Sequence, residues 1–375
     1  MTTGRKRNVV LFGEGGTALA AATSLRNHDI TLVSCVDEPR LAALSRFVKK
    51  SVRLPDRSPA SVTKFLETLE NESRQPVLFM PISDVWIETL SNNLDQVLKV
   101  GRMLPDTPND LALTLDKTAF DETIESLNLP RPIVFGTRIR PDWTPSVYPF
   151  VLKPSSTYRL EVSSGVKAMI VTNPQEWEDL DESVLAGNVF LAQEYLIGAS
   201  ISVCFCTTRH GSLAAAYATE KIHFGQMRTG SRVATVNRPD AIELAEQFVK
   251  LTGLVGYGEL EMIDSARGLV LLELNARPWS QVLMSSEIDV PILELGLALL
   301  SGEDIAPCST GHYTGLEWMM WDQDLLFRRH LRRTGQPIRP PMATRRLYSQ
   351  SFLRDPVPAF IYALHQARYL LTKIF

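Results

Sequence analysis

The first third of the chain alternates short apolar runs with segments of helical pattern. Apolar runs at 8–13, 30–36 and 76–81 predict buried strands, and the alanine-rich residues between the first two predict a helix. Ser83-Asp84 has the residue types of a helix N-terminus. Strands that alternate with helices are typical of a parallel α/β sheet. The stretch LPDTPN at 104–109 marks the natural end of this part.

The middle of the chain predicts one long helix followed by several strands. The helical pattern extends from Asp110 to Pro130 and includes Asp116-Lys117. The residues at 223–232 contain two glycines and two arginines, which indicates a flexible loop. The remaining predicted elements are strands at 150–154, 189–196, 201–207 and 214–219, and a helix at 239–252.

The most informative pattern is a predicted hairpin with strands at 255–263 and 269–275, joined by the turn DSARG. Side chains in a strand alternate between two faces, so pairing of odd with odd positions gathers polar groups on one face. These polar groups are Glu259, Glu261, Glu273 and Asn275. Carboxylates this close repel one another unless protons or cations lie between them, and hard oxygen ligands suit Mg2+ or Mn2+. Arg277 follows directly; the alternative is a hairpin with a solvated acidic face.

Composition and charge limit the class of protein. The 375 residues, of which 45% are hydrophobic, are enough for two or three domains with sizeable cores. The net charge of -3 gives no general support for nucleic-acid binding. The cysteines lack the second pair that a zinc site needs, which favours a reduced, cytoplasmic protein. No apolar stretch reaches the ~18 residues of a membrane-spanning helix, and the N-terminal residues lack a signal-peptide pattern.

Two loops carry residues that suit phosphate binding. The sequence GEGG at 13–16 follows the first strand, and Asp37 ends the second, as in a dinucleotide site. The third glycine of that motif is missing, which favours a structural tight turn. Lys153 precedes a loop with hydroxyl groups and Arg159, which suits a polyphosphate. The alternative for Lys153 is a surface lysine at a strand end.

The order and spacing of five short motifs resemble the ATP-grasp superfamily, most closely its carboxylate-amine ligases of the carbamoyl-phosphate-synthase-like and D-aspartate-ligase-like type. The motifs are LDK, VLKP, QEYLIG, GELEMI and LLELNARPW, and the last is the most specific. The resemblance implies an α/β and α+β fold: an N-terminal parallel α/β pre-ATP-grasp domain, a two-subdomain ATP-grasp fold and a helical C-terminal extension. The implied boundaries are 1–104, 105–305 with a lid subdomain at about 130–192, and 306–375.

The resemblance also implies a role for each residue that matches these motifs. Two lysines and the lid loop would contact the phosphates of ATP: Lys117, Lys153, Ser155 and Ser156. A hinge between the subdomains would bind adenine: Gln193, Glu194, Tyr195 and Leu196. Mg2+ or Mn2+ would be held by Glu261, Glu273 and Asn275. Arg277 and Lys153 would be catalytic, since a planar guanidinium suits the charge that develops on a transferring phosphoryl group.

The activity that the resemblance implies is an ATP-dependent ligase that joins a carboxylate to an amine through an acyl phosphate and releases ADP and phosphate. The substrates would be small molecules, such as an amino acid or a cell-surface glycan precursor. Arg228 or Arg232 would bind a substrate carboxylate. Two departures favour an alternative, a degenerate nucleotide-binding module without turnover. The lid loop lacks paired glycines, and no acidic residue follows the hinge at 198–202.

The C-terminal residues predict a surface for an anionic partner. Residues 326–346 contain seven arginines and no acidic residue, and an amphipathic helix begins near Pro358. This combination permits peripheral contact with an anionic membrane or a lipid-linked glycan. The alternative is a helix packed on the body with solvated arginines. The expected location is therefore cytoplasmic, with membrane contact as one option and a homodimer as another.

Overall fold

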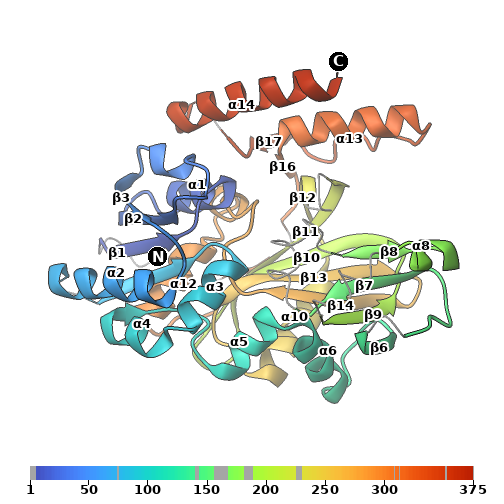
Figure 1. Ribbon diagram of the computed structural model, residues 1–375, viewed down its shortest axis with the longest axis horizontal. Coiled ribbons are helices and arrows are strands. Elements are labelled where there is room, and N and C mark those ends of the chain that lie inside the picture. Colours follow the sequence, from blue (N-terminus) through green and yellow to red (C-terminus); the bar gives the residue numbers. More distant parts are fainter. Residues whose placement is uncertain are drawn as a thin grey trace.

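The computed structural model describes residues 6–73, 76–139, 143–155, 168–180, 189–224, 230–307, 309–311, 313–350 and 353–374. Its strands form a five-stranded, a four-stranded and an eight-stranded sheet. In Figure 1 the N-terminal domain lies to the left of the largest sheet and the four-stranded sheet lies to its right. The two C-terminal helices lie above them in that view. This arrangement confirms the fold class predicted from the sequence.

The N-terminal sheet is parallel and has the strand order β3-β2-β1-β4-β5. Its strands are β1 (Asn8–Phe12), β2 (Asp29–Cys35), β3 (Val48–Leu54), β4 (Val77–Pro81) and β5 (Gly101–Arg102). The helices of this domain are α1 (Gly16–Ser24), η1 (Ala42–Leu44), α2 (Pro59–Glu72), α3 (Asp84–Ser91) and α4 (Leu94–Val100). Apolar side chains of α2, α3 and α4 pack on one face, and those of α1 pack on the other. Because α3 begins just after β4, Asp84 lies at the carboxyl edge of the sheet.

The four-stranded sheet is antiparallel and has the strand order β6-β9-β7-β8. Its elements are β6 (Val134–Ile139), β7 (Phe150–Pro154), β8 (Met169–Val171), α8 (Pro174–Glu178) and β9 (Phe190–Glu194). This sheet has a small core of its own around Phe150 and Phe190, where the rings of Trp143 and Trp177 meet edge to face at 5.3 Å. β7 carries Lys153 next to its last residue.

The eight-stranded sheet has the order β14-β13-β10-β11-β12-β16-β17, and β15 pairs with β11 off this path. Its first five strands in sequence are β10 (Gly198–Thr207), β11 (Leu213–Phe224), β12 (Gly230–Val236), β13 (Tyr257–Ser265) and β14 (Gly268–Asn275). The remaining strands are β15 (Ser309–Thr310), β16 (Leu316–Met319) and β17 (Arg345–Tyr348). Strands β16 and β17 come from the C-terminal extension, which is therefore not only helical as the sequence predicts but part of the large sheet.

Helices cover the large sheet unequally. On one face, α5 (Pro108–Leu115), α6 (Lys117–Ser126) and α10 (Pro239–Thr252) pack on apolar side chains of β13 and β14. On the other face, α11 (Leu283–Glu287) and α12 (Ile292–Leu300) pack only near the N-terminal domain. The polar side of the hairpin belongs to this second face, where it faces the four-stranded sheet.

Several predicted elements have different bounds in the structure, and two of them concern the site. The single helix predicted from Asp110 to Pro130 is two helices, α5 and α6, because Asp116 caps the second one. Its Oδ1 accepts hydrogen bonds from the backbone N–H groups of Thr118 at 2.8 Å and Ala119 at 3.3 Å. Lys117 is therefore the first residue of α6. Of the loop predicted at 223–232, residues 223–224 belong to β11 and residues 230–232 belong to β12, whereas residues 225–229 lie outside the described residues.

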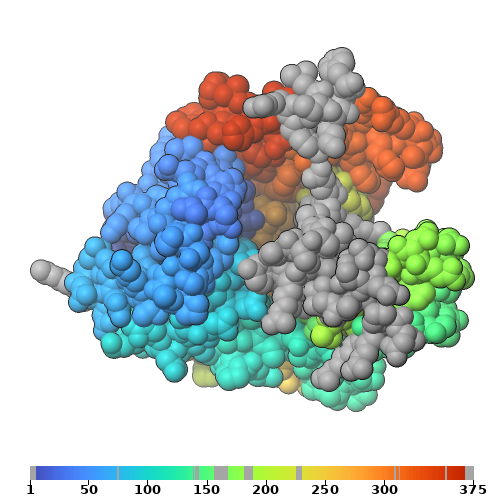
Figure 2. All heavy atoms as spheres, viewed as in Figure 1, coloured from blue at the N-terminus to red at the C-terminus, as the bar shows by residue number. Residues whose placement is uncertain are grey.

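The C-terminal helices α13 (Trp321–Arg333) and α14 (Pro356–Ile374) lie at the surface. The beginning of α14 lies against the N-terminal domain (Figure 2), where Ser45 Oγ donates a hydrogen bond to the buried Asp355. Within the described residues, no helix combines the length and the apolar character needed to cross a membrane.

Candidate active site

The hairpin of β13 and β14 has the register that the sequence predicts. Glu259 lies opposite Asn275, and Glu261 lies opposite Glu273. A register irregularity follows Glu261, so the alternation is preserved only in the half of the hairpin that carries the polar side chains. This half lines a cleft of about 520 Å³ between the two larger sheets and the four-stranded sheet.

The cleft brings most of the predicted site residues together. Those that line it are Lys117, Lys153, Gln193, Glu194, Tyr195, Leu196, Glu261, Glu273, Asn275 and Arg277. They come from α6, from both strands of the hairpin, and from β7 and β9 of the four-stranded sheet with the residues after it. The same cleft is also lined by residues that the sequence analysis does not assign: Asp84, Lys221, Glu259, Trp279 and Gln281.

Each of the two paired glutamates is neutralised by a lysine. Lys117 Nζ lies 3.1 Å from Glu273 Oε1, and Lys221 Nζ lies 2.6 Å from Glu261 Oε2. Burial disfavours the charged form of Lys221, but the carboxylates of Glu261 and Glu259 outweigh it and raise the pKa of this lysine. Carboxylates this close were expected to need protons or cations between them. In the structure, the ammonium groups of Lys117 and Lys221 supply the positive charge.

Asn275 and Arg277 continue this chain of contacts towards the N-terminal domain. Asn275 Nδ2 donates to Glu261 Oε1 at 3.2 Å, and Asn275 Oδ1 accepts from Arg277 Nη2 at 3.0 Å. The guanidinium of Arg277 also forms a two-point contact with Asp84, in which Nε donates to Oδ1 and Nη2 donates to Oδ2. Arg277 is therefore held in one orientation by a residue 193 positions away.

Glu259 lies deeper in the cleft and is 4% exposed. Gln281 Nε2 donates a hydrogen bond to Glu259 Oε1 at 2.8 Å. Burial and, after it, repulsion from Glu261 raise the pKa of Glu259 to about 7. The family resemblance gives this residue no role, yet the pairing rule for strands already places it on the face of Glu261.

Lys153 faces the cleft from the four-stranded sheet. Burial and, after it, the positive charge of Lys117 lower the pKa of Lys153 to about 8, against the opposing effect of Glu273 and Glu261. An anion bound between the two lysines would relieve this repulsion. The cleft therefore combines the ammonium groups of Lys117 and Lys153 with the carboxylates of the hairpin.

Comparison with known proteins places part of the chain in a family. Residues 114–281 match the family described as ATP-grasp domain. This part of the chain is an ATP-grasp domain. It contains every residue of the cleft except Asp84. No curated protein matches the chain.

Solved structures of similar fold cover most of the chain around the ATP-grasp domain. One is the N5-carboxyaminoimidazole synthetase from Staphylococcus aureus complexed with ADP, with a TM-score of 0.62, 13% identity and coverage of 82% of this chain and 81% of that one. Another is an L-amino acid ligase from Bacillus licheniformis, with a TM-score of 0.61, 14% identity and coverage of 81% and 78%. A third is the biotin carboxylase–βγ-ATP complex from Campylobacter jejuni, with a TM-score of 0.64, 15% identity and coverage of 83% and 74%.

The predicted lid residue Ser155 joins the four-stranded sheet to the start of α6 in the ATP-grasp domain. Ser155 Oγ donates to Asp116 Oδ1 at 2.7 Å, and the carbonyl of Ser155 accepts from the N–H of Lys117 at 3.0 Å. Ser155 does not line the cleft itself; it fixes Lys117 relative to Lys153. The predicted contacts of Ser156 and Arg159 lie outside the described residues.

The predicted hinge of the ATP-grasp domain is held by polar contacts on both sides. Gln193 Nε2 donates to Asp121 Oδ1 at 3.0 Å, while Gln193 Oε1 is buried with no hydrogen-bond partner among the described residues. The carboxylate of Glu194 pairs with Arg267, from the turn of the hairpin. Gln193 and Glu194 therefore connect the four-stranded sheet to α6 and to the tip of the hairpin.

Arg232 has a structural position instead of the predicted contact with a substrate. It is fully buried in β12 and does not line the cleft. Its Nη2 donates to Glu317 Oε1 at 2.6 Å, and its guanidinium also donates to the carbonyls of Arg339 and Pro340. Arg232 thus fastens the C-terminal strand β16 to the ATP-grasp domain. Arg228, the other candidate for this contact, lies outside the described residues.

The glycine-rich turn near the N-terminus is a structural feature. The carboxylate of Glu14 accepts hydrogen bonds from the backbone N–H groups of Leu41, Ala42 and Ala43. The backbone N–H groups at the start of η1 are thus already hydrogen-bonded to the Glu14 carboxylate. Asp37 pairs with Arg57 at 2.9 Å. These contacts agree with the tight-turn interpretation and leave Asp37 engaged within the domain.

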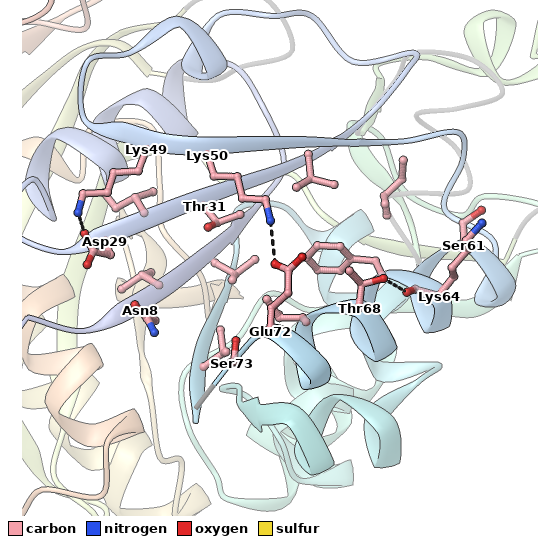
Figure 3. A pocket seen from close by; sticks show the side chains of 18 of the residues that line it. Asn8, Asp29, Thr31, Lys49, Lys50, Ser61, Lys64, Thr68, Glu72 and Ser73 are labelled. Atoms are coloured by element: carbon pink, nitrogen blue, oxygen red, sulfur yellow. Dashed lines mark hydrogen bonds and ion pairs between the residues drawn. The ribbon is translucent and has the colours of Figure 1, made fainter. Parts of the chain in front are cut away.

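A larger cavity, of about 640 Å³, lies between α2 and the strands β2 and β3 of the N-terminal domain (Figure 3). Two of its lysines already have carboxylate partners: Lys50 pairs with Glu72 at 2.9 Å, and Lys49 pairs with Asp29. None of the predicted site residues lines this cavity. The cleft of the ATP-grasp domain is smaller but concentrates the carboxylates and cations, so it is the candidate active site.

Proposed function

We propose that this protein is an ATP-dependent ligase that joins a carboxylate to an amine through an acyl-phosphate intermediate, with release of ADP and phosphate. The observation that carries the proposal is the convergence of Glu261, Glu273 and Asn275 with Lys117 and Lys153 in one cleft. The match to the ATP-grasp domain supports it, as do two structural neighbours, one named as a ligase and one solved in complex with ADP.

The oxygen ligands of the hairpin fit a Mg2+ or Mn2+ ion. Glu261, Glu273 and Asn275 present two carboxylates and an amide oxygen, which are hard ligands. The two carboxylates lie directly opposite each other in the hairpin, so each needs a positive charge nearby. These three residues would hold the metal, which when bound would neutralise charge on the terminal phosphates of ATP.

The other residues of the cleft would position the substrates and the transferred group. Lys117 and Lys153 would bind phosphate oxygens, and Gln193 to Leu196 would bind adenine. Arg277 would stabilise the charge on the phosphoryl group, with the orientation that Asp84 imposes. Acyl phosphates hydrolyse in water, so exclusion of water by the four-stranded sheet would be part of the mechanism. We further propose that the carboxylate substrate is an amino acid or a cell-surface glycan precursor.

A screen of phosphate release tests the proposal. Amino acids and carboxylated sugars are combined in pairs with ATP and Mg2+, and ADP and phosphate are measured for the wild type and for Glu273→Ala. The matched control is Glu246→Ala, since Glu246 is a surface residue that pairs with Lys250. We expect release that Glu273→Ala abolishes and Glu246→Ala preserves. ATP binding without release for any pair would instead indicate a degenerate nucleotide-binding module without turnover.

The C-terminal helix supports a second proposal, peripheral contact with an anionic membrane or lipid-linked glycan. Leu353, Val357, Phe360 and Leu364 are 94%, 52%, 57% and 54% exposed, and helical spacing places the last three on one face. Leu353 also lines a small pocket with Arg26, Arg46 and Arg354. Apolar side chains beside arginines suit an anionic interface.

Liposome co-sedimentation tests this second proposal. The variant Val357→Ser/Phe360→Ser/Leu364→Ser should lose binding to anionic vesicles, whereas Leu251→Ser, which changes an exposed leucine of α10, should not. If light scattering shows a dimer that the triple variant converts to a monomer, the stripe is an interface between two copies of this chain instead.

A further inference from the structure

The atoms predicted to bind a metal ion already have partners within this chain. Glu273 Oε1 lies 3.1 Å from Lys117 Nζ, and Glu261 Oε2 lies 2.6 Å from Lys221 Nζ. Asn275 Oδ1 accepts a hydrogen bond from Arg277 at 3.0 Å. Each predicted metal ligand therefore has at least one oxygen occupied by a cationic side chain.

Lys221 reaches Glu261 across an intervening strand. Lys221 is in β11 and Glu261 is in β13, with β10 between them. Neighbouring strands are about 4.8 Å apart, so the lysine has to span roughly 10 Å of sheet. Two serines of β10 lie between the strands of the pair: Ser200 is directly opposite Lys221, and Ser202 is directly opposite Glu261. Serine is small enough to leave this path open for the long side chain.

The two ion pairs balance the charges of Glu261 and Glu273 without a metal. Lys117 and Lys221 supply two positive charges to the carboxylates of Glu273 and Glu261. A divalent cation added alone would compete with these ammonium groups and leave a positive excess in a partly buried site. Nucleotide phosphates carry the negative charge that can attract the lysines instead. Lys117 and Lys221 can then release the carboxylates for the metal.

We propose that Lys221 is a metal-competing residue of the nucleotide site: its ammonium group occupies Glu261 in place of the metal, so that the cleft takes up a divalent cation only together with nucleotide. This inference rests on the proposed function, since it assumes that Glu261 is a metal ligand. Lys221 and Lys117 release Glu261 and Glu273 as phosphate oxygens replace the carboxylates as their partners. Nucleotide and metal then raise each other's affinity by the same factor, as linkage requires.

Binding of Mn2+, followed by the electron paramagnetic resonance of the free ion, tests the proposal without turnover. The wild type is titrated with Mn2+ alone and with Mn2+ plus a non-hydrolysable ATP analogue, after correction for Mn2+ held by the analogue in solution. We expect the analogue to raise Mn2+ affinity between about fivefold and about 150-fold. In Lys221→Met, Mn2+ affinity without the analogue should rise at least about tenfold, because Glu261 loses its competing cation.

Two variants serve as controls. Lys221→Arg keeps the positive charge and should behave as the wild type. Lys50→Met removes a lysine that pairs with Glu72 on the surface, at 2.9 Å, and should leave Mn2+ binding unchanged. If Lys221→Met does not fold, which its circular dichroism would show, equal Mn2+ affinities of the wild type with and without the analogue would still overturn the proposal.

The outcomes separate this inference from the proposed function. Equal Mn2+ affinity of the wild type with and without the analogue would overturn the inference, and so would a folded Lys221→Met that binds Mn2+ as the wild type does. If no variant binds Mn2+ even with the analogue, the metal site itself is refuted, and the proposed function with it.

Discussion

The contact between Arg277 and Asp84 makes the N-terminal domain part of the candidate active site. Asp84→Ala removes the acceptor of two guanidinium N–H groups of Arg277 and leaves the hydrogen bond from its Nη2 to Asn275 Oδ1, at 3.0 Å. We expect the variant to be less stable and Arg277 to lose its fixed orientation. Both effects can be measured, and the first needs no knowledge of the substrates.

The magnitude follows from the burial of the pair. Hydrogen bonds to charged groups contribute about 1.5–3 kcal/mol each, and fully exposed ion pairs contribute at most about 1 kcal/mol. The side chains of Arg277 and Asp84 are 16% and 21% exposed, which lies much closer to the buried case. We therefore expect a loss of about 2–3 kcal/mol in the free energy of unfolding, less than for a fully buried pair. Of this, the lost charge at the start of α3 accounts for about 0.3–1 kcal/mol.

Chemical denaturation of Asp84→Ala, Arg277→Met and the double variant measures this contact. Asp95→Ala is the matched control, because Asp95 is also in the first turn of a short helix in the same domain. Equal losses in Asp84→Ala and Asp95→Ala, or a coupling energy below about 0.5 kcal/mol in the cycle, would refute the reasoning. With a substrate pair in hand, Asp84→Ala should also lower kcat by about 100-fold, as expected for a misplaced catalytic group, with a smaller change in the KM for ATP.

Three further predictions concern buried charges. Arg232→Met should lower the free energy of unfolding by about 3–5 kcal/mol because it removes the nearer cation of the fully buried Glu317, whose ion pair with Arg346 spans 3.7 Å. Arg232→Met/Glu317→Met should recover most of this loss, and equal urea midpoints for wild type and Arg232→Met would contradict the structural role. Lys153 has a pKa of about 8 in the folded protein against 10.5 for the free side chain, so the folded state binds fewer protons and stability should rise with pH between these values. Lys153→Met should abolish that rise, and an unchanged pH profile of the melting temperature would count against the assignment. Glu259 has a raised pKa of about 7 against 4.5, so its contribution to stability is present at low pH and is lost as pH rises through 7. Glu259→Gln should flatten this fall, whereas a fall that persists must come from another group.

The register of the hairpin could be predicted from the sequence because one face is polar and the other is apolar. Glu261 opposite Glu273, and Glu259 opposite Asn275, is the pairing that keeps Leu260 and Leu274 in the core. A shift by one residue would bury the glutamates among apolar side chains and expose the leucines. This consistency within a few residues carries most of the sequence-based interpretation.

Lys221 and Asp84 could not be predicted in the same way. Lys221 is brought to Glu261 by the order of three strands, and Asp84 is brought to Arg277 by the packing of two domains. Neither residue belongs to a motif with a fixed spacing to its partner. Glu259 is a different case. The alternation of side chains along the strand already placed it on the same face as Glu261, but the family resemblance gave it no role, so no function was predicted for it.

Strands with charged sequences were also missed. β3, with the sequence VKKSVRL, is an edge strand whose side chains are mostly exposed, so it lacks the apolar run of its neighbours. Lysines on an edge strand hinder pairing with other chains, which explains their presence there. β17 begins with Arg345 and Arg346. These two arginines indicated a basic surface, so no strand was predicted there.

The buried pair of Arg232 and Glu317 has a consequence for the order in which the protein is completed during synthesis. Glu317 follows Arg232 by 85 residues, so at about 5–20 residues per second it is made roughly 4–17 s later. During that interval β12 is an unpaired edge that carries an arginine without its acceptor. An edge of this kind can pair with other chains. The C-terminal strands therefore finish the protection of the sheet, and a chain that stops before β16 should be prone to aggregate even though it contains the whole ATP-grasp domain.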